Sequence, residues 1–201
     1  INVTGFNPSR VLESIDQIQS VCASIEHSYA NDLTIVLKAP NGAQVMLKNV
    51  GSTGGATNAC NMGEPVASGP IDEWNNANIT PGVGYNYCWN SNPTYGTMNQ
   101  MIQSGNLPYY TYVSTFGNTL SDYYLPSGSY APIGNFESLI GTPLNGAWTL
   151  IVTDNYPLDN GYIFEWSISI SADLPDSVFT INQAASTQVS AVKTNPDCGL
   201  R

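Results

Sequence analysis

Apolar and polar side chains alternate in several stretches of the chain, which is the pattern of strands with one buried face. The clearest stretch is 147–154, where Trp148 and Leu150 occupy every second position, and residues 162–170 repeat the pattern with aromatic side chains. Residues 155–161 lie between them and are rich in types that favour tight turns. We therefore expect the two stretches to form the central hairpin of a β-sandwich.

The first quarter of the chain predicts a long strand followed by a second hairpin. Val21 and Ile25 lie at inward positions of a strand expected over residues 18–29. Short alternating runs follow at 33–37 and 45–47, separated by an Asn-Gly pair at 41–42 that is typical of hairpin turns. The predicted fold class is all-β, a jelly-roll sandwich of two antiparallel sheets.

The middle of the chain has little periodicity. We expect residues 51–131 to form a long, irregular insertion, with one short helical turn over 97–104. Loops of this length in compact domains are usually functional or covalently restrained. Beyond Ala172 the composition shifts to small polar residues, so the sequence predicts one sandwich domain over residues 1–172. Residues 173–201 follow as an extension, either an extra strand or a linker.

The charge balance narrows the range of partners. The net charge is −10, and the five basic residues are dispersed along the chain. No basic patch can neutralise a run of phosphates, so we do not expect nucleic acid as a partner. No apolar run is long enough to cross a bilayer, so we do not expect membrane insertion. Neighbouring domains or subunits, or a protein or glycan surface, remain as expected partners.

The four cysteines predict disulfides. Their spacing does not fit a zinc motif, and an even count in a weakly charged β-protein indicates an oxidising compartment. We therefore expect a secreted, extracellular or cell-surface protein. Three pairings are open, of which we favour Cys60 with Cys88, closing the insertion, and Cys22 with Cys198.

Three segments of the chain resemble the proprotein convertase P domain (P/Homo B domain). Residues 26–42, beginning Glu-His-Ser-Tyr and containing Asp-Leu-Thr-Ile-Val-Leu, are similar to its opening signature H-x-y-x-x-D-L-x-I-x-L-x-x-P-x-G. Residues 144–154 resemble n-G-x-W-x-L-x-v-x-D, and residues 161–168 resemble G-x-l-x-x-W-s-l. The resemblance covers roughly residues 14–171 and is weakest over 55–130. It is strongest to the variant found in secreted multidomain surface proteins of Bacteroidetes-type bacteria.

The resemblance implies a jelly-roll module that is not itself catalytic. In convertases the P domain lies beside a protease domain and stabilises it, whereas in bacterial proteins it is one module of many. His27 is the single histidine, and the chain lacks a G-x-S-x-G elbow, so we expect no enzyme activity. A protease domain elsewhere in a parent protein remains open.

Acidic side chains in turns beside the expected core strands are candidate calcium ligands. Calcium binds six to eight oxygens from carboxylates and loop carbonyls, and such turns supply both. Some P domains hold calcium, so the resemblance also favours it. The candidates are Asp32, Asp72, Asp154 and Asp159, with Asp154 and Asp159 expected close enough to share a cation. The alternative is that these carboxylates accept hydrogen bonds from turn backbone.

Aromatic residues crowd the insertion among asparagines and glycines. Ring faces beside amides suit sugars or a protein partner. The candidate binding residues are Trp74, Tyr85, Tyr87, Trp89, Tyr110 and Tyr124, although the tryptophans also suit an anchoring role. Three functions stay open: an accessory or adhesive module, a carbohydrate-binding jelly roll, and a subunit of an extracellular filament. In the last, the N-terminal segment or residues 177–192 would pack on a neighbour as an added strand.

Overall fold

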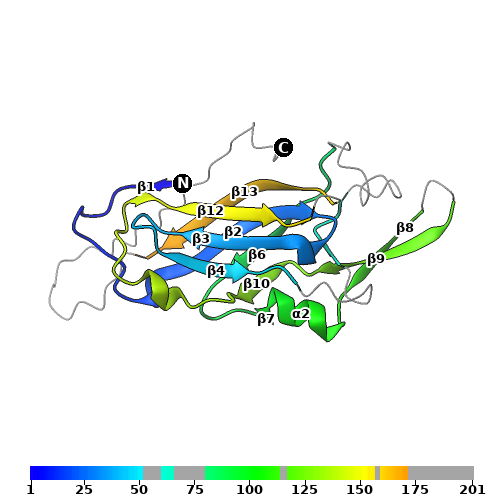
Figure 1. Cartoon of the computed structure of the whole chain (residues 1–201), viewed down its shortest axis with the longest axis horizontal. Helices are drawn as coiled ribbons and strands as arrows, with labels where there is room; N and C mark the ends of the chain where they lie inside the picture. The colour runs from blue at the N-terminus through cyan, green and yellow to red at the C-terminus, as the bar shows by residue number, and fades with distance from the viewer. Residues whose placement is uncertain (52–59, 66–79, 114–116, 157–158, 172–201) are drawn as a thin grey trace, which may run out of the picture.

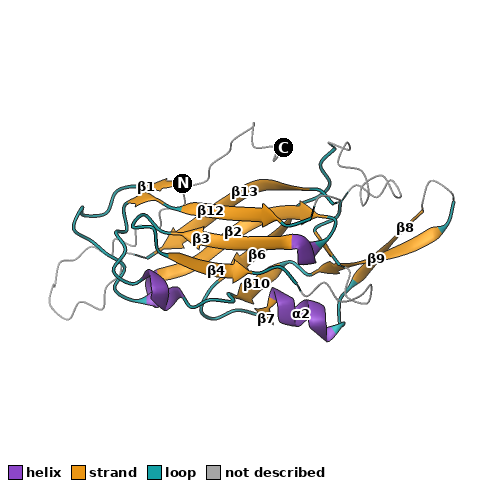
Figure 2. Ribbon diagram, viewed as in Figure 1, coloured by secondary structure: helices purple, strands orange, loops and turns teal. Residues whose placement is uncertain are grey.

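A computed structural model describes residues 1–51, 60–65, 80–113, 117–156 and 159–171, and strands dominate these residues (Figure 2). The strands are β1 (Asn2–Val3), β2 (Ile18–His27), β3 (Leu33–Lys38), β4 (Gln44–Lys48), β5 (Asn61–Met62), β6 (Tyr85–Trp89), β7 (Tyr95–Thr97), β8 (Tyr109–Val113), β9 (Thr119–Leu125), β10 (Gly128–Ala131), β11 (Gly146–Ala147), β12 (Thr149–Asp154) and β13 (Gly161–Ile170). The helix is α2 (Met98–Ser104), and three 3-10 turns are η1 (Ile15–Gln17), η2 (Ala30–Asp32) and η4 (Phe136–Leu139).

The strands form two layers, which confirms the predicted all-β sandwich (Figure 1). The smaller layer has the order β12-β3-β4 and is antiparallel. In the larger layer β2 pairs with β13 on one edge and with β6 on the other, and β10 and β7 follow beyond β6. The larger layer is mixed rather than antiparallel, because β10 runs parallel to both β6 and β7, and β9 runs parallel to β5.

One hydrophobic core fills the space between the layers. Ile25 of β2 and Ile35 of β3 contribute to it from opposite sheets, and both are almost fully buried. Trp89 and Trp148 are the largest side chains with no exposed surface. Burying a large apolar side chain stabilises a fold by roughly 1.5–3 kcal/mol, so this core supplies most of the favourable energy.

The hairpin predicted around Asn41-Gly42 is confirmed. β3 and β4 pair directly, and the N–H of Gly42 donates to the carbonyl of Ala39 at 2.9 Å. Gly42 has a φ of +92°, a conformation that costs glycine little, and the Asn41 side chain accepts from the N–H of Ala43. Three loop residues ending in a left-handed glycine make a common hairpin connection.

The predicted central hairpin over residues 147–170 is wrong, because its two strands lie in different sheets. β12 pairs with β3, whereas β13 pairs with β2. A register shift between Ile163 and Glu165 also changes which side chains of β13 face inward. Ile163 and Trp166 pack against the core, and Phe164 is 41% exposed. Strict alternation cannot reveal such a bulge.

The expectation of an irregular insertion over residues 51–131 is also wrong where the structure describes them. β6 is an interior strand of the larger sheet, its neighbour β10 comes from the same region of the chain, and so does β7, which pairs with β10. The helical turn predicted near residue 100 is confirmed as α2. The Thr97 hydroxyl caps it by accepting a hydrogen bond from the N–H of Gln100. The side-chain carbonyl of Gln100 in turn accepts a hydrogen bond from the N–H of Thr97.

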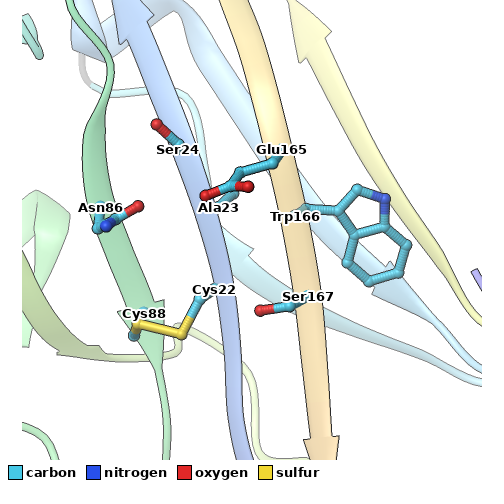
Figure 3. Close-up of a pocket in the computed structure, with 8 residues that line it drawn as sticks. All are labelled: Cys22, Ala23, Ser24, Asn86, Cys88, Glu165, Trp166 and Ser167. Atoms are coloured by element: carbon cyan, nitrogen blue, oxygen red, sulfur yellow. A yellow bond between two sulfur atoms is a disulfide. The ribbon is translucent and has the colours of Figure 1, made fainter. Parts of the chain in front are cut away.

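The disulfide joins Cys22 to Cys88, which corrects the predicted pairings of Cys60 with Cys88 and Cys22 with Cys198. Cys22 and Cys88 are direct cross-strand neighbours on β2 and β6, with their Cα atoms 4.0 Å apart (Figure 3). Cys60 is a free, buried thiol, and residue 198 lies outside the described residues. The disulfide links the middle region of the chain to the sandwich, and it does so through β6, which is an interior strand of the larger sheet.

Candidate functional site

Three of the four predicted acidic residues lie near one another at one end of the sandwich. Asp32 ends η2, Asp154 ends β12, and Asp159 precedes β13. The carbonyl of Asp32 accepts hydrogen bonds from the backbone N–H and the side-chain amide of Asn155, at 3.0 and 2.6 Å. These bonds hold the β12–β13 connection against η2. The fourth candidate, Asp72, lies outside the described residues.

Asp32 and Asp159 form a carboxyl–carboxylate pair. Their side chains are hydrogen bonded to each other, which requires that one of the two carry a proton. Burial, together with the hydrogen bond and the negative charge of Asp32, raises the pKa of Asp159 to about 6. Burial raises the pKa of Asp32 as well. The two groups therefore titrate as a pair and share one proton under weakly acidic conditions.

Asp154 faces His27 rather than the carboxyl pair. The Nε2 atom of His27 lies 3.6 Å from Oδ2 of Asp154, and its Nδ1 accepts from the N–H of Tyr29. Burial works to raise the pKa of Asp154, but the contact with His27 and the N–H of Tyr156 outweigh it and lower the pKa. The histidine side chain is only 5% exposed, so its ring is fixed within the fold.

Lys48 brings a positive charge to the same region. Its side chain is fully buried, and Nζ donates to the carbonyls of Leu33 and Asn49 at 2.9 and 3.1 Å. Burial lowers the pKa of Lys48 to about 8, while the negative charge of Asp32 acts in the opposite direction. A cation held this close offsets part of the negative charge on Asp32.

Within the described ranges, no group of three or more histidine, cysteine, aspartate or glutamate side chains is arranged to hold a metal ion. The sequence predicts that Asp154 and Asp159 share a cation, but the direct partner of Asp159 is Asp32. Two carboxyl groups in contact, with a third nearby beside an imidazole, make an acidic turn cluster. We call Asp32, Asp154 and Asp159 the acidic cluster below.

Two of the predicted binding aromatics belong to the core. Tyr87 and Trp89 point inward from β6 and have no exposed surface. The hydroxyl of Tyr87 donates to the carbonyl of Leu125 at 3.0 Å and accepts from the N–H of Gly63 at 2.7 Å. These bonds fasten the ends of β5 and β9 to the sandwich. The structure thereby corrects the expectation that Tyr87 contacts a ligand. The burial of Trp89 agrees with the anchoring role given as its alternative, and Trp74 lies outside the described residues.

Tyr85, Tyr110 and Tyr124 are brought together as half-buried rings. The Tyr85 and Tyr124 rings meet edge to face at 5.5 Å between centroids, and Tyr110 lies 5.7 Å from Tyr124. The hydroxyl of Tyr85 donates to the carboxylate of Glu64. Burial and the contact with Glu64 together raise the pKa of Tyr85 to about 12. These rings support the base of the β8–β9 hairpin.

The β8–β9 hairpin extends beyond the sandwich (Figure 1). It carries the two most exposed aromatic side chains among the described residues. Tyr109 is 61% exposed and Tyr123 is 48% exposed, and their rings lie 5.9 Å apart on directly paired positions. Val113 and Leu120 are also exposed. The site prediction omitted Tyr109 and Tyr123, although the run Tyr-Tyr-Thr-Tyr-Val at 109–113 is itself a strand signal.

A further hollow of about 210 Å³ lies on the outer face of the larger sheet, beside the disulfide (Figure 3). Its polar lining includes Ser24 of β2, Asn86 of β6, and Glu165 and Ser167 of β13. These side chains come from three neighbouring strands and alternate with residues that face the core. The hollow is small for a ligand pocket and has one charged group.

Together these features define the class of the protein: an all-β sandwich with an acidic cluster at one end and an exposed aromatic hairpin. Comparison of the chain with family models, with curated proteins and with solved structures gives no match. The part of the chain that the structure describes contains no helix long and apolar enough to cross a membrane.

Proposed function

We propose that the chain is a non-catalytic, extracellular module similar to a P domain, which acts by contacting other domains, subunits or surfaces. The observation that carries this proposal is the projecting β8–β9 hairpin with its exposed Tyr109 and Tyr123. Exposed aromatic rings on a charge-poor surface are typical of contact sites, because they bury a large area at low conformational cost.

The disulfide supports an extracellular setting. Disulfides persist in oxidising compartments and are rare where thiols are kept reduced. The Cys22–Cys88 bond joins two interior strands, so the fold gains a covalent link where the larger sheet is already paired.

The surroundings of His27 support a role without catalysis. Its Nδ1 is occupied by a backbone N–H, and its Nε2 faces the carboxylate of Asp154. A histidine that activates a nucleophile must hold a hydroxyl or thiol at one ring nitrogen. Both nitrogens of this buried ring are directed to other groups.

We test the contact role with a double substitution on the hairpin. Binding of the full chain to immobilised neutral polysaccharides and extracellular proteins is measured by biolayer interferometry. Tyr109→Ala/Tyr123→Ala should weaken binding at least about tenfold, because aromatic anchors carry much of the energy of such contacts. Tyr156→Ala is the matched control, since Tyr156 is 41% exposed but lies on the β12–β13 connection.

Two results would contradict this proposal. Binding that is equal for the double variant and the wild type would remove the hairpin from the contact. Hydrolysis of casein or of a polysaccharide by the purified chain would replace the contact role with an enzymatic one.

A carbohydrate ligand is the second candidate, favoured by the surroundings of the exposed ring pair. Tyr109 and Tyr123 share one face of the hairpin with Thr111 and Ser121, which are also exposed. Hydroxyls beside ring faces match the alternating polar and apolar surface of sugar rings. A glycan array separates this candidate from a protein partner: discrete glycan hits lost in the double variant support it, and a blank array rejects it.

The third possible function, a subunit of an extracellular filament, loses one of its two expected donor strands. β1 pairs with β11 of its own chain, and the N-terminal amine donates to the carbonyl of Trp148 at 2.8 Å. The N-terminal segment is therefore already used within the molecule. Residues 177–192, the other expected donor, lie outside the described residues.

We also propose that calcium binds at the acidic cluster. The contact between Asp32 and Asp159 supports it, because a divalent cation can take the place of the shared proton. Calcium is expected to raise the melting temperature by several degrees and EDTA to reverse the rise, with Asp159→Asn abolishing the response. A wild-type melting temperature that does not respond to calcium would remove the proposal.

A further inference from the structure

β8 is the last strand in the order of its sheet, so its outer edge is suited to pair with another strand. β8 pairs with β9 through five consecutive positions without a register shift. It lies at the end of its sheet, and in the described part of the chain no strand pairs with its other side. Such an edge presents a row of N–H and C=O groups in the geometry of a β-ladder.

Other sheet edges of the molecule are protected against pairing. The carbonyls of Met46 and Leu47 on β4 accept from the N–H groups of Gly134 and Ile133, at 2.7 and 3.3 Å. β13 has two register shifts and carries Glu165, and bulges and charges both discourage pairing. β7 is only three residues long. β12 is the other flat edge, and it ends in the charged Asp154.

β8 has none of these protective features. Its sequence, Tyr-Tyr-Thr-Tyr-Val, contains no charge and no proline, and its three residue types, Tyr, Thr and Val, all favour strands. Between residues 105 and 131 the single charged residue is Asp122, which lies on β9. The chain as a whole has a net charge of −10, so a contact between two copies through this hairpin would meet less charge repulsion than one through the acidic parts of the surface.

We propose that two copies of the chain associate by pairing their β8 strands in antiparallel orientation about a two-fold axis at Thr111. In this register Thr111 lies opposite Thr111 of the second copy, Tyr110 opposite Tyr112, and Tyr109 opposite Val113. A two-fold contact must be self-complementary in this way, and an uncharged strand centred on threonine meets the requirement. The two hairpins then form a continuous sheet of order β9-β8-β8-β9.

The stability of the hairpin supports a second copy as the occupant. A two-stranded ribbon with both faces in water is marginal, whereas four strands stabilise one another. Pairing uses the backbone edge and leaves the faces of the ribbon open. The inference goes beyond the contact role proposed above and does not depend on what Tyr109 and Tyr123 bind.

The test introduces a charged residue at position 111, which lies on the proposed two-fold axis. The mass of the full chain is measured by size exclusion with light scattering over a range of concentrations, and folding is checked by circular dichroism. Wild type should be a dimer. Thr111→Lys and Thr111→Glu should each weaken dimerisation at least about tenfold, because like charges then lie directly opposite. An equimolar mixture of the two variants should restore the dimer.

Thr153→Lys is the matched control, because Thr153 is an exposed threonine on the flat edge of β12. It should leave the dimer intact. A monomeric wild type, a Thr111→Lys chain that still dimerises, or a mixture that stays monomeric would each overturn the inference. A dimer lost only in Thr153→Lys would assign the contact to β12. None of these outcomes decides whether the faces of the hairpin bind polysaccharides or other proteins, which the binding experiment above tests separately.

Discussion

The sandwich body and the β8–β9 hairpin differ in where their apolar side chains lie, although both are built from paired strands. In the body, inward side chains such as Trp148 are fully buried between two sheets, and a disulfide joins β2 to β6. In the hairpin, Tyr109 and Val113 are more than half exposed. The body therefore contributes most of the free energy of folding, whereas the hairpin exposes apolar surface that a partner can contact.

The largest expected effect is a difference in stability between a substitution in the sandwich body and one in the hairpin. Trp148→Ala removes a fully buried ring whose Nε1 donates to the carbonyl of Leu144 at 3.1 Å. It should lower the free energy of unfolding by about 3–5 kcal/mol, measured by urea denaturation. Tyr109→Ala on the hairpin should change it by less than about 0.5 kcal/mol. Equal losses in the two variants would mean that the hairpin is part of the cooperative core.

The second effect concerns the disulfide. Replacing Cys22 and Cys88 together by alanine opens a link between residues that lie 66 positions apart in sequence. The variant should lose about 2–4 kcal/mol of stability. Cys60→Ala is the control, and it removes a buried thiol that forms no disulfide. Peptide mapping under non-reducing conditions should recover Cys22 linked to Cys88, and a peptide linking Cys60 to Cys88 would contradict the structure.

The smallest effect is the pH dependence of the acidic cluster. The pKa of Asp159 is raised from 3.8 to about 6 in the folded state, so the folded chain binds this proton more tightly than the unfolded chain. The resulting stabilisation is complete below about pH 4 and is lost as the pH rises through 6. Because the carboxyl is half-buried and screened by solvent, we expect about 1 kcal/mol.

Asp159→Asn should flatten this part of the stability profile, measured by urea denaturation between pH 4.5 and 7.5. Asp16→Asn is the control, because Asp16 is exposed on η1. A profile that keeps its slope in Asp159→Asn would show that the carboxyl pair does not control it.

The sequence predicts best those features that depend on neighbours along the chain. The β3–β4 hairpin follows from alternation and a glycine turn, and α2 follows from a capping threonine with a glutamine three residues later. The acidic cluster is anticipated in part, because Asp154 and Asp159 flank one turn. Its actual contact, between Asp159 and Asp32, depends on how η2 packs against that turn.

Features that depend on sheet register are not predicted. The turn between β12 and β13 resembles a hairpin turn, yet the strands separate into different sheets because each pairs with a strand from early in the chain. The bulge near Glu165 moves Phe164 to the outer face, against the alternation. The Cys22–Cys88 bond likewise requires β2 and β6 to be neighbours, which local sequence does not indicate.

The position of Cys60 has a consequence for oxidative maturation. In the unfolded chain Cys60 is closer in sequence to Cys88 than Cys22 is, so the entropy of loop closure favours the wrong bond at first. The native bond becomes favoured only when β2 and β6 align and Cys60 is withdrawn into the interior. Correct maturation of this chain therefore depends on strand assembly preceding oxidation, or on a thiol isomerase that reverses early errors.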